Sequence, residues 1–327
     1  MPIAMNPVAG DIHVNRPLTN FSQKYLQTAD KFIALQAFPN LPVSMQSDLY
    51  WEFDRGDFYR DQAEERADGS ETAGGGFKVS TSPYFARVYG FHKDVTDRQR
   101  ANQDQGINLD QSATQFVMQK LMLLRETQFI SNFLNTDSVW TGGVSPDQDV
   151  TWGAAASNPV ADIRAAITAV QGTTGFRPNR MMIGRTAYDT LLENDEILSR
   201  ISGGAVSSQP AIVQRQLLAQ LFELETIHVS EAVRNTAVEG AADSIGYIGG
   251  DHAVVYYAPM SVGLEEPTAG VQFSWTGYTG ATSMGQRIKR FRMEANAADR
   301  IEGEMAYDYK QVAAELGARF IDCSDAA

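Results

Sequence analysis

The clearest hydrophobic pattern in the chain lies between residues 176 and 197. A short apolar run, Met181 to Ile183, is closed by Gly184, and a segment with apolar residues on one helical face follows it. Glycine permits a tight turn, and Thr186 stands three residues before an acid, which is the spacing of a helix-capping box. The pattern predicts a strand, a turn and a short helix. It contains no nucleophile, metal-ligand cluster or phosphate-binding loop.

The longest helical pattern covers residues 110–135. Asp110 or Ser112 can cap it, and neither glycine nor proline interrupts the segment that follows. At about 1.5 Å per residue such a helix would be roughly 37 Å long. Its apolar residues form two adjacent rows, one with Val117, Leu121 and Leu124, and one with Met118, Met122, Phe129 and Phe133. We therefore expect a long supporting helix that packs on a sheet.

The second half of the chain separates into two kinds of pattern. Residues 159–258 alternate helical and strand-like segments, which predicts a compact α/β domain. Residues 259–327 are rich in strand patterns, and Val271, Phe273 and Trp275 alternate there with polar residues. The loop-like stretch 136–158 is the candidate domain boundary. As a whole the chain is expected to be an α+β protein.

Two segments at the start of the chain cannot form a core on their own. Residues 1–40 are rich in proline and polar residues yet hold several aromatics, which indicates an arm lying on its own domain or on a neighbour. Residues 41–92 contain two strand-like runs joined by an acidic, glycine-rich stretch, which predicts a long hairpin with a flexible tip. Asp48 to Glu71 hold nine acids and three arginines, a net charge of −6. Because a two-stranded hairpin is marginally stable alone, we expect it to need a neighbour with a basic surface.

Composition narrows the class of protein. The 327 residues carry a formal net charge of −13, which argues against a protein whose main task is to grip nucleic acid. The single cysteine, Cys323, excludes an internal disulfide framework. No apolar run approaches the roughly 20 residues of a membrane span, and the N-terminus lacks the pattern of a signal peptide. We expect synthesis in a reducing cytoplasm.

Candidate chemistry is sparse. The four histidines, His13, His92, His228 and His252, have no metal-binding spacing, and only the fold could bring one of them to carboxylates. No motif of a catalytic nucleophile stands out. We therefore predict no catalytic, cofactor-binding or metal-binding residues.

A dense basic cluster contains Arg287, Lys289, Arg290 and Arg292. Such a cluster could bind nucleic acid. The acidic character of the whole chain favours a different interpretation, a charged strand face paired with acids of the same or another subunit.

The order of these elements resembles that of the major capsid proteins of tailed bacteriophages, which have the Hong Kong 97-type fold. Two stretches carry the resemblance most clearly, RPNRMMIGRTAYDTLLENDEIL at 177–198 and RIEGEMAYDYKQVAAELGARFID at 300–322. The resemblance implies a division into an N-terminal arm (1–40), an E-loop (41–92), a peripheral domain (93–158) with its spine helix (110–135), an axial domain (159–258) and a β-rich return to the peripheral domain (259–327).

The same resemblance implies a shell protein of the virion and not an enzyme. Copies of it would assemble as hexamers and pentamers, in the cytoplasm of the bacterial host, into an icosahedral shell around double-stranded DNA. A portal and a decoration protein are implied partners, and no cofactor or membrane is. No long helical extension precedes the arm, so a separate scaffolding protein or a cleaved precursor is also implied.

Seven charged residues are candidates for contacts between subunits. The hairpin contributes Glu64, Glu65 and Lys78, and the basic surface of the neighbour contributes Arg287, Lys289, Arg290 and Arg292. Some family members cross-link through an E-loop lysine and an asparagine, but no asparagine can be identified as the partner of Lys78. Two other functions stay open, an encapsulin-like nanocompartment shell and a cytoplasmic α/β enzyme with a carboxylate site.

Overall fold

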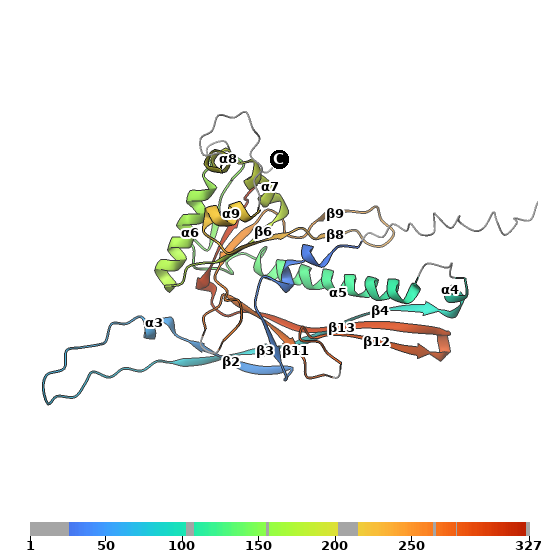
Figure 1. Cartoon of the computed structure of the whole chain (residues 1–327), viewed down its shortest axis with the longest axis horizontal. Coiled ribbons are helices and arrows are strands. Elements are labelled where there is room, and N and C mark those ends of the chain that lie inside the picture. The colour runs from blue at the N-terminus through green and yellow to red at the C-terminus, as the bar shows by residue number, and fades with distance from the viewer. Residues whose placement is uncertain are drawn as a thin grey trace, which may run out of the picture.

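The computed structural model describes residues 26–102, 108–154, 157–201, 215–263, 266–278 and 280–324. The expectations for residues 1–25 of the arm and for the segment 202–214 lie outside these residues. Figure 1 shows a compact part made of helices and a sheet, from which a long helix and a long sheet extend to one side and a two-stranded ribbon to the other. Helices and strands are segregated in the extended part and interleaved in the compact part, which together make a mixed α+β architecture.

The compact part is built on a mixed sheet, here called the central sheet. Its strand order is β5 (Asp147–Asp149), β14 (Gly317–Ile321), β10 (Ala253–Tyr256), β6 (Arg180–Gly184) and β7 (Thr226–Ser230). The strand β10 is antiparallel to β6 and β14, whereas β6 and β7 are parallel. The helices that pack with it are α6 (Pro159–Thr174), α7 (Arg185–Glu193), α8 (Asp195–Ile201) and α9 (Arg215–Phe222).

The elements predicted for residues 176–197 are confirmed, because β6 leads directly into α7. The capping box predicted at Thr186 is wrong. Gly184 occupies the N-cap position of α7 and no side chain caps the helix, while Asp189 accepts a hydrogen bond from Nε of Arg185 at 3.0 Å. Gly184 serves close packing, since a Cβ atom there would clash with the carbonyl oxygen of Gly250.

A second sheet, here called the long sheet, extends away from the compact part (Figure 1). It has the order β1 (Asn40–Val43), β11 (Gly270–Trp275), β13 (Ala298–Gln311) and β12 (Gln286–Met293), and β4 (Arg87–Thr96) also pairs with β13. The short helix α4 (Asp97–Ala101) follows β4, and the 3-10 turns η3 (Glu294–Asn296) and η4 (Ala314–Leu316) flank β13.

The long helix α5 (Leu109–Phe133) lies along the long sheet and confirms the helix predicted for residues 110–135. Its N-cap is Asn108, whose side chain accepts a hydrogen bond from the amide of Gln111 at 3.1 Å, so the predicted caps were wrong. Helix and sheet meet at Gly303, where a Cβ atom would lie 2.6 Å from Cγ1 of Val117. The absence of a side chain there allows the close approach.

The predicted hairpin is confirmed for residues 47–85 as a ribbon of two strands, β2 (Ser47–Phe53) and β3 (Val79–Phe85), which pair from Ser47↔Phe85 to Phe53↔Val79. The outer parts of the predicted range 41–92 lie elsewhere, because β1 and β4 belong to the long sheet. The short helix α3 (Arg55–Phe58) stands in the connection between them. A smaller hairpin, β8 (Val233–Asn235) with β9 (Ile245–Tyr247), projects from the compact part.

The described part of the arm lies on its own chain. It forms two 3-10 turns, η1 (Ala29–Lys31) and η2 (Ile33–Leu35), and enters the core at Phe38. The Phe38 ring is 1% exposed and meets the rings of Phe129, Phe133 and Tyr256 edge-on. Of the two alternatives left open for the arm, packing on its own domain holds for residues 32–38.

Two segments lie elsewhere than the sequence suggested. We expected a loop-like boundary at 136–158 and a single β-rich region at 259–327, but β5 and β14 both belong to the central sheet. Trp152 is fully buried and packs on Phe320 of β14. Among the described residues of the final region, only β11, β12 and β13 lie in the long sheet. Among the described residues, no helix has the length and apolar character needed to cross a membrane.

Candidate assembly surfaces

One face of the ribbon formed by β2 and β3 is apolar and uncovered. Because directly opposed residues of an antiparallel pair share a face, the register places Leu49, Trp51, Val79 and Phe85 together. Their side chains are 58%, 60%, 48% and 51% exposed, respectively. The opposite face holds Tyr84, which stacks on Phe273 of the long sheet at a centroid distance of 4.3 Å. The ribbon is therefore anchored by one face and leaves the other free.

The connection between β2 and β3 carries the predicted hairpin residues. Glu64, Glu65 and Lys78 are all exposed, and the amide of Lys78 donates to Oδ2 of Asp57 at 2.9 Å. The hydroxyl of Tyr59 donates to the carbonyl oxygen of Thr174 at the end of α6. This contact ties the start of the connection to the compact part of the same chain. The acidic residues beyond it face solvent.

The predicted basic cluster lies on β12, where strand alternation divides it between the two faces of the long sheet. On the face away from α5, Arg287 contacts Glu304, with 2.8 Å from Nε to Oε2. Lys289 Nζ lies 3.0 Å from the same carboxylate and 3.7 Å from Glu302. Each of these cations therefore meets an acid of the adjacent strand β13.

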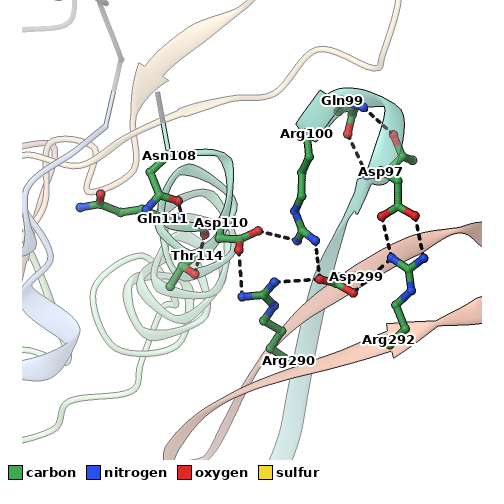
Figure 2. Close-up of polar contacts among 11 residues, drawn as sticks. Asp97, Gln99, Arg100, Asn108, Asp110, Gln111, Thr114, Arg290, Arg292 and Asp299 are labelled. Carbon is green, nitrogen blue, oxygen red and sulfur yellow. Dashed lines mark hydrogen bonds and ion pairs between the residues drawn. The ribbon is translucent and has the colours of Figure 1, made fainter. Parts of the chain in front are cut away.

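On the other face, Arg290 and Arg292 enter the charged cluster shown in Figure 2, which we define as Asp97, Arg100, Asp110, Arg290, Arg292 and Asp299. Arg290 bridges Asp110 at 2.9 Å and Asp299 at 2.8 Å. Arg292 binds both oxygens of Asp97 at 2.6 Å. The hydrogen bonds from Arg290 and Arg100 lower the pKa of Asp299 to about 2. The cluster joins the start of α5 to α4 and to the strands β12 and β13 of the long sheet.

The sequence left open whether the basic residues of β12 pair with acids of the same subunit or of another. The structure pairs all four basic side chains of the predicted cluster with acids of the same chain. A contact between these residues and another subunit stays a prediction. An exposed ion pair such as Arg292–Asp97, whose side chains are 36% and 49% exposed, typically contributes only about 0–1 kcal/mol to stability, so it can exchange partners at low cost.

The sequence analysis missed a buried carboxylate, Glu126, in the middle of α5. It is 0% exposed and accepts hydrogen bonds from the amides of Ile33 at 3.2 Å and Ala34 at 2.9 Å. The hydroxyl of Ser230 on β7 donates to it at 3.4 Å. Burial raises the pKa of Glu126 to about 7. This one side chain joins the arm, the long helix and the central sheet.

A signal for Glu126 was present in the sequence. It stands four residues after Met122 and three before Phe129, which places an acid within the apolar row of the helix. Its neighbour Arg125 is equally unusual, because it is 1% exposed and its Nε donates to the hydroxyl of Tyr309 at 2.6 Å. Its guanidinium lies 4.5 Å from the centre of the Tyr307 ring.

Sequence comparison finds phage proteins. Residues 143–263 match the family model described as phage major capsid protein E. The major capsid protein of Burkholderia phage BcepMu is 30% identical over 171 residues, which cover 52% of this chain and 53% of the relative. That match thus spans about half the relative's length. The major capsid protein of Pseudomonas phage JBD67 is 26% identical over 254 residues, covering 76% of this chain and 78% of the relative.

Structural comparison finds the same fold over nearly the whole chain. A phage-related protein from Bordetella bronchiseptica RB50 matches with a TM-score of 0.67 at 18% identity and covers 95% of this chain and 98% of that one. A subunit of the mature capsid of bacteriophage PhiM1 matches with a TM-score of 0.58 at 10% identity, with 95% and 92% covered. The SrpI encapsulin of Synechococcus elongatus PCC 7942 matches with a TM-score of 0.51 at 11% identity, with 99% and 97% covered. These likenesses show the Hong Kong 97-type fold, and the encapsulin shares it.

Proposed function

We propose that the chain is a major capsid protein of a tailed bacteriophage and that its copies form the icosahedral shell that encloses the double-stranded DNA of such a phage; the matches to phage major capsid proteins and the shared fold support this. Its place is therefore the virion, and its partners include copies of itself. The encapsulin match concerns the fold alone, whereas the sequence relatives are major capsid proteins.

The apolar face of the ribbon is the observation that carries the proposal. A two-stranded ribbon of this kind is marginally stable alone. Its Leu49, Trp51, Val79 and Phe85 remain about half exposed in the single chain. Burying such side chains against a second copy would stabilise both partners, and exposed apolar patches of this kind mark interaction surfaces.

The division into capsid domains follows from this assignment. In our proposal the ribbon and its connection form the E-loop, residues 26–40 belong to the N-terminal arm, and α5 is the spine helix. The long sheet with α5 forms the peripheral domain, and the central sheet with its helices forms the axial domain. The axial domain then includes β5 and β14 in addition to residues 159–258.

The finer points of assembly are proposals of the same kind. We expect hexamers and pentamers of the chain, assembled in the cytoplasm of the bacterial host. A separate scaffolding protein, a portal and a decoration protein are the expected partners. The net charge of −13 fits a shell that surrounds DNA without adhering to it. Contacts of Glu64 and Glu65 with a neighbour's Arg287, Lys289, Arg290 and Arg292 belong to this proposal, as does a contact between subunits through Lys78.

Electron microscopy of the purified full-length chain tests the proposal. The wild-type protein is expected to form large closed particles. Trp51→Glu places a charge on the apolar face and should leave small soluble species with an unchanged thermal unfolding transition, because Trp51 is 60% exposed in the single chain. Ser80→Lys, which places a charge on the opposite face of the same ribbon across from Glu52, is the matched control and should still assemble. Normal particles from Trp51→Glu would refute the role of the apolar face, and a wild-type chain that stays monomeric would refute self-assembly.

A further inference from the structure

Two segments far apart in the sequence meet at one end of the central sheet. Ala253, the first residue of β10, pairs with Phe320 near the end of β14. The residues just before β10 therefore lie opposite the residues just after β14. The amide of Cys323 donates to the carbonyl oxygen of Asp251 at 3.0 Å and fixes this arrangement.

Three potential metal ligands converge here. Asp251, His252 and Asp322 each offer one ligand atom, and these atoms all lie within 4.8 Å of one another. One imidazole nitrogen with two carboxylate oxygens is a donor set for divalent transition metals. The sequence spacing of the histidines gave no sign of it, because two of the ligands come from one loop and the third from another, some 70 residues later.

The two carboxylates lack a compensating cation. Within the part of the chain that the structure describes, neither Asp251 nor Asp322 forms an ion pair with lysine or arginine, and the nearby Arg319 is engaged by Asp137 and Asp147. Like charges opposed across neighbouring strands destabilise each other. A bound cation would remove that repulsion.

The imidazole of His252 gives a second, independent observation in favour of a metal site. Nδ1 of His252 is buried and has no hydrogen-bond partner among the described residues. Its nearest acid oxygen, Oδ1 of Asp251, lies at 3.5 Å, and the side chain is only 21% exposed. An unpartnered nitrogen 3.5 Å from a carboxylate oxygen is what a metal ion would satisfy.

We propose that Asp251, His252 and Asp322 bind one divalent ion of the Zn²⁺ and Mn²⁺ class and thereby clamp the end of β14 to the start of β10. Three protein ligands leave room for water in the remaining positions. The hydroxyl of Ser324 donates to Oδ2 of Asp251 at 3.2 Å and would hold that carboxylate in place. The proposal is independent of shell assembly, because it concerns a site within one subunit.

Isothermal titration of the full-length, unassembled subunit tests the site. The protein is stripped with EDTA, dialysed and titrated with Zn²⁺ and, separately, with Mn²⁺. The expected result is saturable binding of one ion per chain and a higher thermal unfolding temperature with the ion. Asp322→Asn and His252→Asn should each weaken binding at least about tenfold. His92→Asn, which changes an exposed histidine on β4, is the matched control and should leave the affinity unchanged.

Two results would overturn the proposal. One is the absence of saturable binding of both ions by the wild-type subunit up to millimolar concentration. The other is equal affinity in the wild type and Asp322→Asn. Asp322 is exposed, so this variant is expected to fold, and its circular dichroism spectrum checks that it does. Assembly is scored separately by electron microscopy, so a failure of metal binding leaves the proposed function untouched.

Discussion

Glu126 should make the stability of the subunit depend on pH in a defined direction. Its pKa rises from an ordinary value of 4.5 to about 7 in the folded chain, chiefly because burial disfavours the charged carboxylate. One pKa unit corresponds to about 1.4 kcal/mol, so the full effect is about 3 kcal/mol. Below pH 4.5 the group is protonated in the folded and unfolded chain alike, and no cost arises. Between pH 4.5 and about 7 the unfolded chain ionises this group while the folded chain keeps its proton, so the stability falls over this range and levels off once the pH exceeds the folded pKa.

The low solubility of a protein near its isoelectric point limits the pH range in which this loss of stability can be measured. Because the sequence pI is about 4.8, urea unfolding of the unassembled subunit is best followed between pH 5.5 and 8.5. About 2 kcal/mol of the loss falls in this window, since pH 5.5 already lies above the unfolded pKa. Glu126→Gln carries no charge at any pH and removes this component. The difference in unfolding free energy, wild type minus Glu126→Gln, should therefore fall by about 2 kcal/mol from pH 5.5 to 8.5.

Taking the difference cancels the other groups that titrate in this range. The glutamine loses one acceptor for the amides of Ile33 and Ala34, which costs about 1 kcal/mol at every pH and does not alter the slope. Glu239→Gln, a change at an exposed acid, is the matched control and should show a flat difference. A flat or rising difference for Glu126→Gln would refute the reasoning. It would mean that the amide donors outweigh the desolvation of the carboxylate.

Two further predictions follow from the long sheet. Replacing Arg290 and Arg292 together with Glu should lower the unfolding temperature of the unassembled subunit, because the new charges would face the aspartates of the charged cluster. If the double variant unfolds like the wild type and only shell formation is lost in electron microscopy, these arginines act between subunits instead. Gly303→Ala should destabilise the subunit by about 1–3 kcal/mol in urea unfolding, since the new methyl group would overlap Val117. Gly246→Ala, with open space around the glycine, is its control, and equal stability of the two variants would contradict the packing argument.

The periodicity of apolar residues was sufficient to predict elements whose structure depends on nearby residues alone. The observed start of α5 lies within one residue of the predicted start, and β6 and α7 lie where the apolar run and its closing glycine predicted a strand and a helix. Strand partners were not predictable in this way. β14 lies between β5 and β10, and no local pattern reports a pairing across more than sixty residues. The misplaced caps have a similar cause, because several neighbouring residues can cap a helix and the chain path selects one.

Charge patterns along a strand were the least informative signal, and the reason bears on assembly. Arg287 and Lys289 face one side of the long sheet and Arg290 the other, so a dense cluster in the sequence is not a patch in space. These cations meet acids of their own chain, which leaves apolar burial as the main source of assembly free energy. Each half-exposed apolar side chain of the ribbon could contribute about 1 kcal/mol when covered. A single contact of this kind is weak, but every subunit of a closed shell repeats it. The complete shell can therefore be stable while a single misplaced subunit still dissociates.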